Sequence, residues 1–175
     1  MLAIAIPLAL ALQAATAAPP AGGRILPPAC DSEAHGQFDF WVGSWDVFPA
    51  GSDKKVADSL IERKHRGCAV VENWMPLNGF GGTSLNHVDA ATGIWHQKWV
   101  GAAPGAVDFT GGWTGTSMVL TGEWPSPTDP HKLVRMTYTP QADGSVRQFG
   151  ESSTDFGVTW QTAFDLIYRR KETTP

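Results

Sequence analysis

"GTSLNHVDAATGIWHQKWV", residues 82–100, contains two runs of alternating side chains on either side of the segment DAATG. Asp and Gly in that segment favour a tight turn, so the two runs are expected to pair as an antiparallel hairpin. If Asp89 pairs with Ile94, three further pairs follow: Val88 with Trp95, Asn86 with Gln97, and Ser84 with Trp99. Because successive side chains point to opposite faces of a strand, these last six residues share one face.

Short runs of the same kind continue on both sides of this hairpin, at intervals of about 8–14 residues. The segments between them, such as TGT (114–116) and QADGS (141–145), are too short for crossover helices, so neighbouring runs are expected to pair antiparallel. Eight Trp and nineteen Gly favour closely spaced strands around an aromatic interior. The sequence therefore predicts an all-β, antiparallel up-and-down barrel of about 8–10 strands, since closure removes exposed edges. A short helical turn is expected before it, in the front half of FDFWVGSWDVF (38–48).

A short motif inside that segment resembles a known fold family. GSW, residues 43–45, resembles the Gly-x-Trp motif that opens the first strand of lipocalins and other calycins. The resemblance implies a structural role for Gly43, and implies that Arg169 or Arg170 packs across Trp45 at the closed end of a calycin-type barrel. Together with VVENW, DGSVRQ and STDFGVTW, the chain resembles a family of uncharacterised secreted bacterial proteins with a lipocalin-like fold. That family implies a cupped barrel and supplies no agreed activity or catalytic residues.

The N-terminal segment has the features of a secretory signal. Residues 1–18 are apolar and uncharged and end in small residues, although no Lys or Arg precedes the apolar run. The alternative, a membrane-spanning helix, is disfavoured because the run is barely long enough and no charge cluster follows it. We expect a signal peptide (1–18), a Pro/Gly-rich linker (19–37), a barrel (38–170) and a C-terminal tail (171–175). The mature protein would be periplasmic or secreted, with no membrane anchor after cleavage.

Cysteine content and charge narrow the function classes. Cys30 and Cys68 remain after the predicted cleavage, and an oxidising compartment favours a disulfide between them over two unpaired thiols. The net charge of −4 has no acidic or basic block, which favours neither nucleic acid nor an anionic membrane as a partner. The sequence makes no prediction of the oligomeric state.

STDFGVTW, residues 153–160, matches the Asp-box pattern of sialidase-type β-propellers. A propeller needs at least four blades, and this chain of 175 residues contains the pattern once. We therefore interpret it as a structural turn: Asp155 would accept backbone N–H groups, Gly157 would adopt a positive φ, and Trp160 would pack over the hairpin.

The tryptophans and amides of the quoted hairpin suggest a site for a small molecule. Large aromatic surfaces beside a few polar groups are typical of ligand pockets, but the same side chains could instead fill the core. The leading hypothesis is a barrel that binds a small apolar or aromatic ligand, and a protein-interaction module is an alternative. The candidate ligand-binding residues are Glu72, Trp74, Ser84, Asn86, Trp95, Gln97, Trp99 and Trp113.

Two carboxylates support a different hypothesis, an enzyme. Glu72 alternates with Val70 and Trp74, and Glu151 would oppose Val134 if Thr139 pairs with Val146. If both acids enter an apolar cavity, desolvation would raise a pKa and allow general acid or base catalysis on a cyclic or sugar-like substrate. The competing interpretation is a buried carboxylate that bonds Arg135, Arg147, Ser84 or Asn86, or one that simply faces water.

Histidines are the remaining candidates for a metal or haem. The hairpin register places His87 opposite His96 on the other face, where two imidazoles lack an obvious third and fourth ligand. Nitrobindins, which are lipocalin-like barrels, hold haem through a histidine late in the chain, and the corresponding segment WQTAFDLIYRR (160–170) contains none. We therefore predict neither a metal site nor a cofactor.

Overall fold

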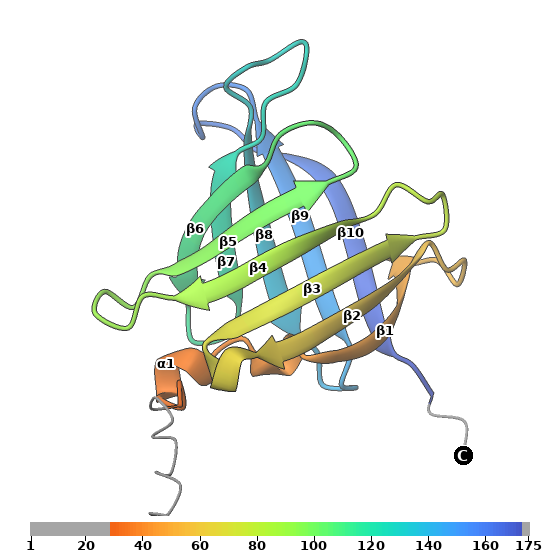
Figure 1. Ribbon diagram of the computed structural model, residues 1–175. Helices are drawn as coiled ribbons and strands as arrows, with labels where there is room; N and C mark the ends of the chain where they lie inside the picture. Colours follow the sequence, from red (N-terminus) through yellow and green to blue (C-terminus); the bar gives the residue numbers. More distant parts are fainter. Residues whose placement is uncertain (1–28, 173–175) are drawn as a thin grey trace, which may run out of the picture.

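The computed structural model describes residues 29–172, so the predicted signal peptide, residues 19–28 of the predicted linker and residues 173–175 lie outside it. Ten strands form a barrel in which each strand pairs antiparallel with its sequence neighbours, and the first pairs with the last (Figure 1). This confirms the predicted all-β up-and-down barrel. The strands are β1 (Gly43–Pro49), β2 (Ala57–Lys64), β3 (Ala69–Pro76), β4 (Gly82–Val88), β5 (Trp95–Gly101), β6 (Val107–Trp113), β7 (Met118–Glu123), β8 (Leu133–Pro140), β9 (Val146–Ser153) and β10 (Gln161–Arg170).

The hairpin of β4 and β5 has the register that its sequence predicts. Asn86 lies opposite Gln97, and Ser84 lies opposite Trp99. The turn is held by Asp89, whose backbone N–H donates to Ile94 O at 2.9 Å and whose carboxylate accepts from Ala91 N at 2.8 Å. Burial alternates along both strands, so the predicted shared face is the interior of the barrel.

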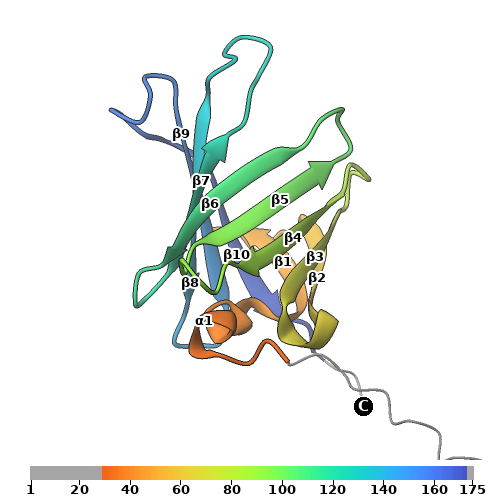
Figure 2. The same ribbon diagram turned by 60° about the vertical axis from the view of Figure 1, so that its left-hand side comes forward.

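One end of the barrel is closed by the segment before β1. It contains α1 (Glu33–Gly36), within the predicted linker, and the 3₁₀ turn η1 (Asp39–Trp41), which confirms the predicted helical turn. Figure 2 shows α1 below the lower strand ends. Phe38 and Trp41 are fully buried and stacked, with ring centroids 4.9 Å apart, and both rings contact Tyr138 inside the barrel. These aromatic side chains fill the closed end; the opposite end carries the long loops seen at the top of Figure 1.

Trp45 and Arg170 join the first and last strands at this closed end. The two residues are paired across β1 and β10, and the Arg170 guanidinium lies 4.4 Å from the centre of the buried Trp45 ring. The indole N–H of Trp45 donates to Trp41 O at 2.9 Å. A Cβ at Gly43 would come within 2.5 Å of Arg170 Nη1, so glycine leaves room for the guanidinium. Of the two arginines that the resemblance suggested, Arg170 has this role, whereas Arg169 stacks over Phe48.

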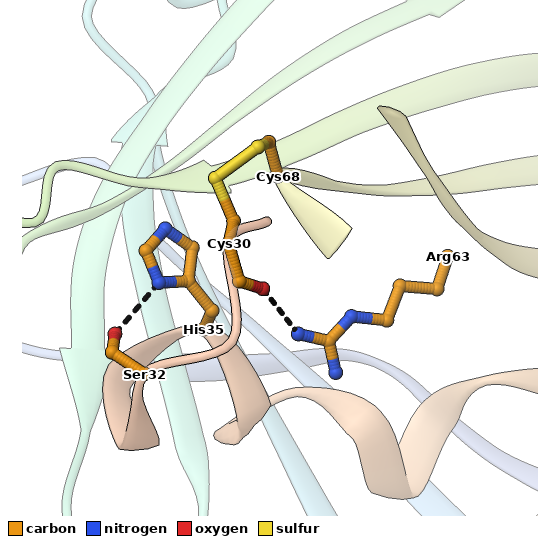
Figure 3. Close-up of a disulfide and its surroundings, with 5 residues drawn as sticks. All are labelled: Cys30, Ser32, His35, Arg63 and Cys68. Atoms are coloured by element: carbon orange, nitrogen blue, oxygen red, sulfur yellow. Dashed lines mark hydrogen bonds between the residues drawn. A yellow bond between two sulfur atoms is a disulfide. The ribbon is translucent and has the colours of Figure 1, made fainter. Parts of the chain in front are cut away.

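A disulfide between Cys30 and Cys68 fastens the closing segment to the barrel (Figure 3). Cys68 follows the short 3₁₀ turn η2 (His65–Gly67) between β2 and β3. Cys30 also donates its backbone N–H to Arg66 O at 3.0 Å, and its carbonyl accepts from Arg63 Nη2 at 2.9 Å. The predicted disulfide is therefore confirmed, and it anchors the described end of the predicted linker.

The Asp-box sequence forms the turn between β9 and β10. Asp155 accepts hydrogen bonds from Thr159 Oγ1 at 2.6 Å, from Thr159 N at 2.8 Å and from Ser153 Oγ at 2.7 Å, and these bonds lower its pKa to about 2. Gly157 has φ +87°, and Trp160 Nε1 donates to Gly157 O at 3.0 Å. These contacts account for the motif as a turn.

Within residues 29–172, no helix is both long enough and apolar enough to cross a membrane.

Replacing both cysteines by alanine should lower the free energy of unfolding by about 4 kcal/mol, because the bridge restricts a chain segment of 38 residues in the unfolded state. Urea unfolding of the oxidised wild type and of the double variant measures the difference. Equal unfolding free energies would contradict the inferred anchoring role of the disulfide.

Candidate ligand-binding site

A cavity of about 200 Å³ lies inside the barrel, between the aromatic closed end and the long loops. Seven of its twelve lining residues are aromatic, and the other five include three polar side chains. The lining residues are Glu72, Trp74, Gln97, Trp99, Phe109, Trp124, Met136, Tyr138, Gln148, Phe164, Leu166 and Tyr168.

The outer part of the cavity is a wall of half-buried rings. Trp74 from β3, Trp99 from β5 and Phe164 from β10 are joined there by Trp124, which follows β7. The Trp124 ring lies 6.5 Å from that of Trp99 and 6.0 Å from the buried ring of Phe109. Such separations are typical of interacting aromatic pairs, so the rings support one another around the space.

Two glycines allow rings of this wall to lie against a neighbouring strand. A Cβ at Gly82 would lie 2.6 Å from the Trp99 indole, and a Cβ at Gly150 would lie 2.2 Å from the Phe164 ring. Gly82 precedes Thr83 in β4, and Gly150 is paired with Phe164 across β9 and β10. Glycine at these two positions therefore leaves the room that the rings of Trp99 and Phe164 occupy.

The deep part of the cavity contains Glu72, which is 4% exposed. Its Oε1 accepts a hydrogen bond from Ser59 Oγ at 3.0 Å, and its Oε2 accepts one from Ser84 Oγ at 3.2 Å. Behind Ser84, Asn86 Nδ2 donates to the Ser84 hydroxyl at 3.0 Å, and Asn86 Oδ1 accepts from Gln97 Nε2 at 2.7 Å. This chain links β2, β3, β4 and β5.

A second chain of hydrogen bonds returns to Glu72 around the other side of the barrel. Gln97 Nε2 donates to Tyr138 Oη at 3.3 Å, and Gln148 Nε2 donates to the same oxygen at 3.1 Å. Tyr168 Oη then donates to Gln148 Oε1 at 2.7 Å and lies 3.4 Å from Glu72 Oε1. The two chains together form a closed ring of polar side chains around the cavity floor.

Burial dominates the electrostatics of this floor. It raises the pKa of Glu72 from the ordinary 4.5 to about 7, and the hydrogen bonds from Ser59, Ser84 and Tyr168 only partly oppose the shift. Burial also raises the pKa values of Tyr138 and Tyr168, so both phenols are neutral near pH 7. No Lys, Arg or His is among the described residues that line the cavity. Glu72 therefore titrates near neutrality with no basic side chain beside it in the cavity.

The predicted ligand-binding residues divide into three groups. Four line the cavity: Glu72, Trp74, Gln97 and Trp99. Ser84 and Asn86 are buried behind the lining and orient Glu72 and Gln97 through hydrogen bonds.

The other two predicted residues belong to the closed end. Trp95 donates its indole N–H to Gln37 Oε1 at 2.9 Å, and the Trp113 ring lies 5.6 Å from Phe40. Both residues lie at strand ends next to the closing segment, so they pack against it and take no part in the cavity wall. The inner face of the β4–β5 hairpin therefore serves both purposes that the sequence left open. Trp99 lines the cavity, whereas Trp95 fills the core at the closed end.

Eight lining residues were not predicted. Tyr138 and Met136 in β8, and Phe164, Leu166 and Tyr168 in β10, alternate with outward residues, so period-two alternation was the signal that could have found them. Trp124 directly follows β7 and continues the alternation of its buried residues Met118 and Leu120, since its N–H donates to Lys132 O at 2.8 Å, so the same signal could have found it. The remaining lining residues that the sequence interpretation missed are Phe109 and Gln148.

The assumed register for Glu151 is wrong by one residue, and the interpretation that holds is the competing one, a carboxylate bonded to Arg135. Val146 pairs with Pro140, because Gln141 N donates to Ser145 O at 2.8 Å and closes the hairpin one residue later than expected. Glu151 consequently pairs with Arg135, whose guanidinium donates two hydrogen bonds to it at 3.0 and 2.8 Å. This ion pair lies on the outer face, so Glu151 does not enter the cavity.

His87 and His96 face each other on the outer wall as the register predicts, with ring centroids 5.1 Å apart. Among residues 29–172, no group of three or more His, Cys, Asp or Glu side chains is arranged to hold a metal ion. The stacked pair is a surface contact between neighbouring strands.

Glu72 should make stability depend on pH. Its folded pKa lies above its unfolded pKa, so the neutral form stabilises the fold fully below pH 4.5, and this contribution is lost as pH rises through 7. The loss amounts to about 3 kcal/mol. Glu72→Gln should remove it, so the stability of the variant relative to wild type should increase by about this amount between pH 4.5 and 8.5. Urea unfolding of both proteins at both pH values tests this. The same difference in unfolding free energy at pH 4.5 and at pH 8.5 would contradict it.

The closed antiparallel barrel, with a short helix at one end, is consistent with a calycin-type or lipocalin-like barrel. No protein-family model matches the chain, and no curated protein sequence matches it. Membership of the secreted bacterial family that its motifs resemble therefore stays a prediction.

Proposed function

We propose that the protein binds a small, mainly aromatic or apolar molecule in the cavity of its barrel. The observation that carries this proposal is a space enclosed by seven aromatic rings above a floor of hydrogen-bonded polar groups. Ligand pockets are typically apolar with a few fixed polar groups, which is the composition found here.

The size of the cavity limits the ligand. Its volume of about 200 Å³ is below the roughly 300–1,000 Å³ of drug-sized pockets. It exceeds the ~150 Å³ engineered cavity that accepts benzene. A molecule with one ring and a short polar substituent fits this range.

The polar floor would orient such a ligand. Gln97 has both Nε2 hydrogens committed, to Asn86 Oδ1 and to Tyr138 Oη, so it can present only its carbonyl oxygen to a ligand. Glu72 adds a carboxyl group held by three hydroxyls. The ligand would therefore lie with its ring among the tryptophans and its polar substituent towards Glu72 and Gln97.

The site of action would be outside the cytoplasm, in the periplasm or the medium. The disulfide supports this location, because such bonds persist mainly in oxidising compartments. The signal-like composition of residues 1–18 supports it as well.

Catalysis by Glu72 alone is a second candidate function. A carboxyl group with a pKa of about 7 in a cavity is suited to general acid or base catalysis near neutral pH. A glycosidase with two carboxylates is disfavoured, because Glu151 is bound to Arg135 on the outer face. Turnover of a cyclic substrate that stops in Glu72→Gln would favour this candidate over simple binding.

Trp99→Ala should weaken binding of a small aromatic probe, indole, by about tenfold, because it removes one wall of the aromatic site. Titration followed by NMR gives the dissociation constants. Trp113→Ala is the matched control: this tryptophan packs on Phe40 away from the cavity, so indole affinity should stay unchanged.

Trp45→Ala should mainly lower the free energy of unfolding, by about 3–5 kcal/mol, as expected for a buried tryptophan.

The reverse ranking, with Trp45→Ala or Trp113→Ala weakening binding more than Trp99→Ala, would contradict the assignment. A parallel measurement compares the native and denatured masses of protein purified without denaturant. Non-covalent mass lost on denaturation would allow the natural ligand to be identified.

A further inference from the structure

The cavity contains an acid without a base. Glu72 lies inside it, and its hydrogen-bond partners are the hydroxyls of Ser59, Ser84 and Tyr168. No Lys, Arg or His is among the described lining residues. A buried carboxylate is strongly disfavoured unless a cation compensates it, so the site must acquire positive charge from a proton or from a ligand.

The rest of the cavity is built to receive a cation. Trp74, Trp99, Trp124, Phe109 and Phe164 surround the space with aromatic faces, whose quadrupoles attract positive charge. Tryptophan gives the strongest such attraction, and three of the five are tryptophan. A cage of aromatic rings is a known arrangement for binding ammonium groups.

We propose that the ligand of this cavity is a small organic ammonium ion, with its charged nitrogen bound to Glu72 inside the cavity that the aromatic side chains line. This rests on the proposed function, since it names the class of molecule that the barrel binds.

Hydrogen-bond acceptors are available for the ammonium group. Glu72 Oε2 accepts one hydrogen bond, from Ser84, and a carboxylate oxygen can accept a second. Gln97 presents its carbonyl oxygen, because both its amide hydrogens are committed. An anionic ligand would meet the same acceptors and no donor cation, so the floor selects against it.

Proton and ligand then compete for Glu72. The groups that face it are Ser59 from β2, Ser84 from β4 and Tyr168 from β10, with Tyr138 of β8 further along the ring. Both tyrosines have raised pKa values and stay neutral. Glu72 is therefore the group among these that changes charge between pH 5.5 and 8.5, and cation binding requires its ionised form.

The test uses three probes that share one ring: benzylamine, benzyl alcohol and benzoate. At pH 8 calorimetry should rank their affinities in that order. A fourth probe, benzyltrimethylammonium, keeps its charge at every pH. Its affinity should fall about thirtyfold from pH 8.5 to 5.5, because only the fraction of protein with ionised Glu72 binds it.

Glu72→Gln should abolish the preference for benzylamine over benzyl alcohol and flatten the pH profile of the fourth probe. Glu151→Gln is the matched control: it removes a carboxylate on the outer face, and the preference should persist. Circular dichroism verifies that each variant folds, and the pH profile of the wild type tests the proposal without any variant.

Two results would overturn the inference, and they can be told apart. Benzyl alcohol binding as tightly as benzylamine, with no pH dependence for the fixed cation, would exclude an ammonium ligand and leave the binding of small aromatic molecules intact. Failure of all the probes, indole included, would overturn both the ammonium ligand and the proposed function.

Discussion

Closure of the sheet between β1 and β10 is the constraint on which the other features of this protein depend. The pairing of Trp45 with Arg170 ties the first strand to the last, and the guanidinium stacked on the indole covers the joint. Closure leaves no free edge and encloses an interior that side chains from every strand enter. Without it, Glu72 on β3 and Tyr168 on β10 would not meet, because their contact crosses the interior of the barrel.

The two ends of the barrel divide its interior between stability and binding. At the closed end, the disulfide-anchored segment places Phe38 against Trp41 and against Trp95 of β5. Towards the other end, the rings of Trp74 and Trp99 are only half-buried and leave space between them. The same residue type thus fills the core at one end and lines a cavity at the other.

Local pattern was enough to predict the fold and four of the twelve residues that line the cavity. The register of β4 and β5 followed from the short DAATG turn and from alternation, which placed Gln97 and Trp99 inside the barrel correctly. The QADGS turn was harder: the Gln141–Ser145 bond shifts the pairing by one residue, and such a shift moves Glu151 from the inner face to the outer one.

Other features depend on contacts between distant segments and leave no local signal. The separation of Trp95 and Trp113 from the cavity depends on where the segment before β1 docks. The hydrogen bonds of Gln97 with Tyr138 and of Tyr168 with Glu72 join strands far apart in sequence, so they appear only once the barrel is closed.

The positions of the disulfide and of the closing strand pair impose an order on folding. Cys30 and Cys68 are separated by 38 residues, and Cys68 precedes β3, so their bridge can form when only the first two strands have been synthesised. The pairing of β1 with β10 requires nearly the whole chain. During biosynthesis the edge of β1 that pairs with β10 therefore stays unpaired while the strands after β1 assemble in sequence. Early oxidation would hold the N-terminal aromatic segment beside β2 and β3 during this interval, so the last step is the docking of a C-terminal strand onto a preorganised base.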